Sequence, residues 1–107
     1  MLQIPNLKEL RITLNGIEVL PPTIEQSVNL EILDLNRSLL QTIPLEITKL
    51  TNLKILNLSN NRLQTIPLEI AQLTNLKELD LSRNPIPLKG VQKLKWLLPH
   101  TKVMFHE

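Results

Sequence analysis

The sequence predicts an α/β fold in which repeated coils stack into a solenoid, with equivalent short strands side by side in a parallel sheet. The first observation behind this prediction is that the chain of 107 residues repeats itself every 23 residues without insertion or deletion. The second is that Leu fills 25 positions, and Leu or Ile recurs at the same offsets within each repeat. The third is that only one Trp and one Phe are present, so that the core has to be built from Leu and Ile.

The opening segment of each repeat predicts a strand. Leu56-Asn57-Leu58 alternates apolar and polar residues, which is typical of a short strand with one buried face. Stacking the repeats places equivalent strands parallel and in register, and turns each aliphatic column into a continuous stripe. We expect one domain, 1–107, made of a short N-terminal segment 1–6, repeats 7–29, 30–52, 53–75 and 76–88, and a C-terminal cap 89–107.

One column of the repeats is polar. A buried amide at this position can satisfy backbone groups where the chain turns away from the strand, and successive amides would form a ladder between coils. Ser38 interrupts the column, and a hydroxyl is shorter and has fewer donors. We therefore expect a weaker turn, or a bridging water, at Ser38. The column consists of Asn15, Ser38, Asn61 and Asn84.

This pattern resembles the leucine-rich repeat, LxxLxLxxNxLxx(L/I)P, in the 23-residue class common in bacterial repeat proteins. The resemblance covers residues 7 to about 88, and it implies a right-handed, curved solenoid with strands on a concave face and short helical or irregular segments on a convex face. Pro44 and Pro67 agree, because proline stops a continuing helix and fixes φ. The third repeat matches at Leu53, Leu56, Leu58, Asn61, Leu63, Ile66 and Pro67.

The C-terminal segment predicts a cap. Four aliphatic residues share one face at helical spacing, Pro99 stops the helix, and 101–105 predict a final strand. Trp96 is ambiguous, because repeat register places it in the core and helical spacing places it beside the apolar arc. We expect it to be partly exposed. The four aliphatic residues are Val91, Leu94, Leu97 and Leu98.

The N-terminal end has no equivalent cap, because residues 1–6 are too few to cover an aliphatic stripe. Three arrangements are open: the natural protein is longer, two copies meet front to front or exchange an element, or Leu2 and Ile4 fold back as a partial lid. Leu2 and Ile4 at this end, and Trp96 in the C-terminal cap, are the candidates for self-association as a homodimer.

Strand positions between the buried leucines point outward in three rows. Ile32 and Ile55 should be adjacent, and an apolar centre with a polar rim is typical of protein interfaces. The alternative is that two good strand formers occupy a tolerant surface. The first row is Glu9, Ile32, Ile55 and Glu78, the second is Arg11, Asp34, Asn57 and Asp80, and the third is Thr13, Asn36, Ser59 and Ser82. All of these residues except Thr13 and Ser82 are predicted to contact a partner.

The same rows argue against catalysis and nucleic-acid binding. They contain no aromatic residue for stacking, and the net charge of +2 is mixed in sign. Asp34 and Asp80 lie about 10 Å apart on strand spacing, wider than a glycosidase pair comfortably needs. Without Cys or a glycine-rich phosphate loop, we expect no enzyme and no cofactor.

Metal binding and membrane insertion find little support. His100 and His106 would lie about 20 Å apart along a strand, so one zinc ion cannot join them within a chain. A metal that bridges two chains through these histidines is the alternative. No stretch of about 18 apolar residues exists, which argues against a membrane span. The start MLQIPNLKEL lacks a signal-peptide pattern. Cytoplasm is the expected location, with secreted or cell-surface locations still open.

Three functions follow as hypotheses. The first, which the resemblance implies, is a non-enzymatic module that binds a protein or peptide through its concave face, centred on Ile32 and Ile55. The second is a structural unit that self-associates through the uncapped front end or the C-terminal cap. The third is the recognition part of a larger enzyme, such as a ligase or kinase.

Overall fold

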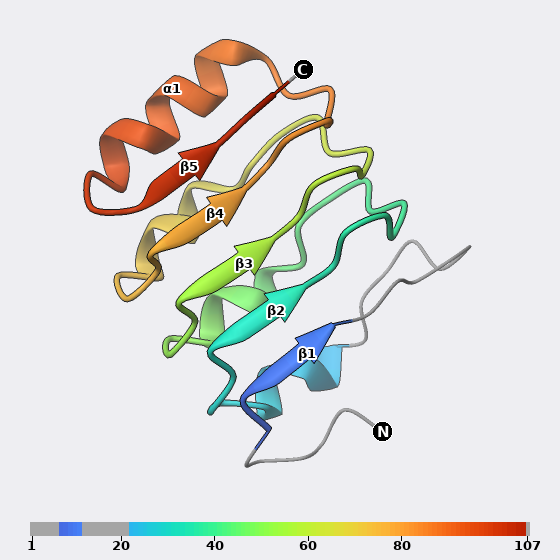
Figure 1. Cartoon of the computed structure of the whole chain (residues 1–107), viewed down its shortest axis with the longest axis vertical. Helices are drawn as coiled ribbons and strands as arrows, with labels where there is room; N and C mark the ends of the chain where they lie inside the picture. The colour runs from blue at the N-terminus through green and yellow to red at the C-terminus, as the bar shows by residue number, and fades with distance from the viewer. Residues whose placement is uncertain (1–6, 12–21, 107) are drawn as a thin grey trace.

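The computed structural model describes residues 7–11 and 22–106 of the chain. Their centre is a parallel sheet of five strands in the order β1-β2-β3-β4-β5 (Figure 1). The first four strands begin 23 residues apart, so that each repeat contributes one, and the cap contributes the fifth. The strands are β1 (Glu9–Arg11), β2 (Ile32–Asp34), β3 (Ile55–Asn57), β4 (Glu78–Asp80) and β5 (Lys102–Met104).

Helical segments cover one side of this sheet (Figure 1). Three of these segments directly follow a proline whose own backbone is extended, namely Pro44, Pro67 and Pro87. Five residues leave room for little more than one turn, and therefore the segments within the repeats are 3-10 helices. The longer helix lies in the cap, as predicted. The segments are η1 (Pro22–Gln26), η2 (Leu45–Lys49), η3 (Leu68–Gln72) and α1 (Leu88–Leu97).

The core lies between the sheet and the helical layer. The central residues of three neighbouring strands, Leu33, Leu56 and Leu79, are aligned in register and fully buried. Ile47 and Ile70 approach them from η2 and η3 and are also fully buried. The predicted α/β solenoid with stacked aliphatic stripes is therefore confirmed. At the C-terminal end the stripes are closed by Val91, Leu94 and Leu98.

Two asparagines of the polar column are buried and bind the turn of the preceding coil. The Oδ1 atom of Asn61 accepts hydrogen bonds from the N–H groups of Ser38 and Leu40 at 2.9 and 3.0 Å, and its Nδ2 donates to the carbonyl of Leu35 at 3.0 Å. Asn84 bonds the third coil in the same way. The predicted ladder between coils is confirmed at these two positions; Asn15 lies outside the described residues.

The turn that carries Ser38 differs from its equivalents. Leu39 has φ of 60°, whereas the equivalent Arg62, one coil further on, is not left-handed. The left-handed region costs a residue with a Cβ atom about 1–2 kcal/mol. This extra strain lies in the coil for which the sequence predicts a weaker turn. All three turns share one further left-handed position, occupied by Arg37, Asn60 and Arg83.

Candidate functional site

The candidate site is the side of the sheet opposite the helical layer, here called the open face (Figure 1). Ile32 of β2 pairs in register with Ile55 of β3, which confirms that the two side chains are adjacent. Both are partly exposed. Glu9 flanks them on β1 and Glu78 on β4. An aliphatic pair thus lies in the middle of the row, with a carboxylate at each side.

Arg11 forms two ion pairs at one end of the open face. Its Nε atom lies 2.7 Å from a carboxylate oxygen of Glu9, and its Nη1 atom lies 3.0 Å from a carboxylate oxygen of Asp34. The hydrogen bond to Glu9, together with the charges of Glu9 and Asp34, raises the pKa of the Arg11 guanidinium. Arg11 therefore stays positively charged and occupies two of the four carboxylates on this face.

The other two carboxylates are not held in an ion pair. Glu78 and Asp80, both on β4, form no ion pair with any described residue. Lys102 pairs with Glu78 in strand register, but its ammonium group makes no salt bridge there. With Arg11 and Lys102 set against Glu9, Asp34, Glu78 and Asp80, the open face keeps a net negative charge, and the carboxylate of Glu78 lies beside Ile55.

Three side chains of the second row also stabilise the turns that follow their strands. Asp34, Asn57 and Asp80 each accept a hydrogen bond from the backbone N–H two residues further on, at 2.9–3.0 Å. This role was not predicted from the sequence. The signal was present, because Asp or Asn followed after one residue by Asn or Ser is typical of a side chain that bonds its own turn. One oxygen of each residue is therefore fixed, and one oxygen of Asp80 remains available.

The third row is less exposed than the sequence predicts. Ser59, expected on the accessible surface, is buried, and its hydroxyl lies 2.6 Å from Oδ1 of Asn57 and 3.0 Å from Oδ1 of Asn36. Asn36 also accepts a hydrogen bond from the amide of Asn60. Side chains of this length reach each other across strands about 4.8 Å apart. This row consequently ties the coils together, and Ser59 is withdrawn as a contact residue.

β5 adds residues to the open face that were not predicted from the sequence. Lys102 extends the first row beyond Glu78, and Met104 extends the second beyond Asp80. The backbone N–H of His106 donates to Oγ of Ser82 at 3.1 Å, which continues the third row. The alternation Lys-Val-Met could have indicated these positions once the final strand was expected. Thr13 lies outside the described residues.

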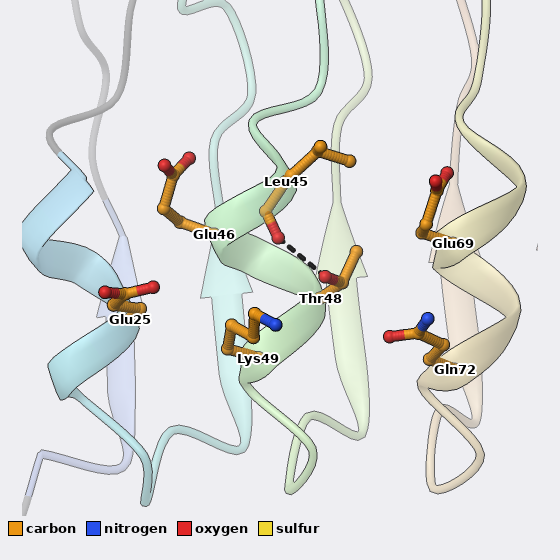
Figure 2. A pocket seen from close by; sticks show the side chains of 7 residues that line it. All are labelled: Glu25, Leu45, Glu46, Thr48, Lys49, Glu69 and Gln72. Atoms are coloured by element: carbon orange, nitrogen blue, oxygen red, sulfur yellow. Dashed lines mark hydrogen bonds between the residues drawn. The ribbon is translucent and has the colours of Figure 1, made fainter.

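A hollow of about 220 Å³ lies on the helical side, lined mainly by polar side chains of η1, η2 and η3 (Figure 2). The carboxylates of Glu25, Glu46 and Glu69 come from three different segments and do not converge on a common point in Figure 2. Thr48 is occupied by its own helix, because its hydroxyl donates to the carbonyl of Leu45.

Among the described residues, no group of three or more His, Cys, Asp and Glu side chains is placed to hold a metal ion. His100 and His106 are both exposed. No helix in the described ranges is long and apolar enough to cross a membrane. Trp96 is 80% exposed, further out than the partial exposure expected. The other self-association candidates, Leu2 and Ile4, lie outside the described residues.

Comparison with known proteins agrees with this geometry. The model of a family described as leucine rich repeat matches residues 28–86. A solved leucine-rich repeat protein of Leptospira interrogans is 42% identical with a TM-score of 0.84, over 92% of this chain and 25% of that one. A plant ice-binding protein is 35% identical with a TM-score of 0.56, over 78% of this chain and 25% of that one. The chain thus spans about a quarter of either structure. No curated protein matches it.

Proposed function

This chain belongs to the leucine-rich repeat family, and from that premise we propose that it is a binding module that holds a protein or peptide segment on its open face. Domains of this family generally mediate binding and are usually non-catalytic. The chain spans about a quarter of the solved structures that it resembles, so that the proposal concerns this domain alone.

The adjacency of Ile32 and Ile55 carries the proposal. The two side chains are in register on neighbouring strands, and both are partly exposed on the side that no described helix covers. Burying an aliphatic side chain against a partner contributes about 1.5–3 kcal/mol when burial is complete. Two adjacent isoleucines therefore supply an apolar centre of the kind found in protein interfaces.

The charges around this centre define the partner's chemistry. Glu78 pairs in register with Ile55 and Asp80 with Asn57, and neither carboxylate forms an ion pair with a described residue. At the opposite end, Glu9 and Asp34 share the single guanidinium of Arg11. A segment that places an aliphatic side chain on Ile32 and Ile55, and an Arg or Lys beside it, matches both features. Charge of this kind mainly favours the correct orientation and fast association, and its effect falls with added salt.

The test is a selection of random displayed peptides against the whole chain, followed by affinity measurements on variants. In Ile32→Thr/Ile55→Thr the substituted residues remain β-branched strand formers and add no charge next to Glu9 and Glu78. We expect the double variant to bind at least tenfold more weakly, since losing about 1.4 kcal/mol corresponds to a factor of ten.

The matched control is Leu45→Thr/Leu68→Thr. These two leucines are also 23 residues apart and are 53% and 51% exposed, but they lie on the helical layer. The control should bind the selected peptides as the unchanged chain does. Equal losses in both double variants, or selected peptides that lack basic and aliphatic residues, would contradict the proposal.

Self-association is the second candidate, and the exposure of Trp96 is the observation that favours it. An exposed indole is a frequent centre of protein interfaces. Light scattering at micromolar concentration tests this candidate, because the chain has a mass of 12.3 kDa. A monomer at every concentration would remove it, and a dimer that Trp96→Ala dissolves would support it.

A further inference from the structure

The outer face of α1 combines an exposed indole with unpaired positive charge. Val91 and Leu94 are buried in the core, and Trp96 points away from them with 80% of its surface exposed. Trp96 is the only tryptophan of the chain. Tryptophan is usually largely buried, so an indole in this position is an unusual feature for a surface that contacts water alone.

Lys89 and Lys93 lie on the same face as Trp96. They precede it by seven and three residues, and residues at these spacings are neighbours on one side of a helix. Lys95 adds a third charge at the flank of this face. None of the three lysines forms an ion pair with a described residue, and residues 88–106 contain neither Asp nor Glu.

This composition fits an anionic bilayer surface. Indoles settle at the headgroup level of membranes, with the ring in the apolar zone and the N–H group in the polar one. Lysine stems extend along the apolar surface while their ammonium groups reach phosphate and carboxylate groups. Because α1 is the outermost segment at its end of the solenoid, its outer face can meet a flat surface without rearrangement (Figure 1).

We propose that the outer face of α1, formed by Lys89, Lys93 and Trp96, docks peripherally on membranes that contain anionic phospholipid. The helix lies along the headgroups with Trp96 inserted and does not enter the bilayer further, because its opposite face is committed to the core. This inference goes beyond the binding module proposed above. The open face lies on the other side of the sheet and stays accessible to a partner.

The test uses the whole chain, with sedimentation of vesicles as the first measurement. Vesicles of phosphatidylcholine alone are compared with vesicles that also contain phosphatidylserine. We expect binding to the anionic vesicles, accompanied by a blue shift of Trp96 emission that reports directly on this face, and little binding to the neutral ones. Each lysine should increase the affinity for anionic vesicles about fivefold, the equivalent of about 1 kcal/mol near an anionic surface.

Three variants make the result specific. Lys89→Gln/Lys93→Gln should bind about 25-fold more weakly, which follows from fivefold for each lysine. Trp96→Ala should also sediment less. Lys54→Gln/Lys77→Gln removes the same charge from two exposed lysines that precede β3 and β4, and it should bind nearly as the unchanged chain does.

Several outcomes would overturn the proposal. Absence of binding to anionic vesicles at low ionic strength would do so. Equal weakening by the two lysine pairs would show general charge attraction with no defined site. A blue shift with polyglutamate but not with anionic vesicles would assign the face to an acidic protein instead. Circular dichroism of each variant identifies any that fails to fold, and loss of peptide binding on the open face would leave these results unaffected.

Discussion

Replacing Asn61 by Ala should weaken the whole stack of coils. The variant removes five hydrogen bonds of a buried amide, two that it accepts and three that it donates. Two of the affected carbonyls keep another donor: that of Leu58 accepts from Asn84, and that of Ser59 accepts from the N–H of Arg37. The loss therefore falls on three groups: the N–H groups of Ser38 and Leu40 and the carbonyl of Leu35.

The magnitude follows from these three groups. A buried polar group that loses its partner costs about 1–3 kcal/mol, and partial relaxation of the turn favours the lower half of that range. We expect a loss of about 3–6 kcal/mol in the free energy of unfolding. Domains of this size have about 5–16 kcal/mol in total, at 0.05–0.15 kcal/mol per residue. One amide therefore accounts for a large share of the stability.

Urea unfolding followed by circular dichroism measures the effect, with Asn75→Ala as the matched control. Asn75 is also an asparagine that donates to a carbonyl of the preceding coil, that of Thr51 at 2.9 Å, but it is exposed. Its loss should cost no more than about 1 kcal/mol, because water replaces the partner. If both variants lost the same small amount, the reasoning from buried, unsatisfied groups would be refuted.

Three further predictions concern packing, backbone and charge. Leu56→Ala, at the fully buried centre of β3, should lower the free energy of unfolding by about 2–5 kcal/mol. Leu68→Ala, on η3 and half exposed, should lower it by less than about 1 kcal/mol, and chemical denaturation measures both variants. Asn60 has φ of 57°, a conformation that glycine adopts freely and valine does not. Asn60→Val should therefore lower the free energy of unfolding by about 1–2 kcal/mol more than Asn60→Gly, which loses the same amide hydrogen bond. Equal losses of stability in the two variants would contradict this prediction. Arg11→Ala should leave the melting temperature nearly unchanged, because ion pairs at the surface contribute little to stability. The same variant frees the carboxylates of Glu9 and Asp34, so it should bind basic peptides more tightly at low salt. Calorimetry measures both effects.

The sequence predicts the repeat positions better than the use of the polar side chains. Because every coil places its leucines at the same offsets, the register of Ile32 with Ile55 and the buried stripe through Leu56 could be foreseen. The fate of Ser59 could not, because it depends on whether the amides of Asn36 and Asn57 turn toward it or toward water. Periodicity determines which face a residue occupies, and neighbouring hydrogen bonds decide whether it stays accessible.

The direction of the amide ladder has a consequence for how the chain matures during synthesis. Asn61 completes the turn of the coil before it, and Asn84 completes the next one, so that each coil waits for a side chain made about one repeat later. Each turn also donates one backbone N–H to the coil that follows it, from Arg37 to Ser59 and from Asn60 to Ser82. The turn at Arg83 donates in the same way to the carbonyl of His106, after β5. Ordering of a nascent chain should therefore trail the ribosome by one coil and finish only when the final strand emerges.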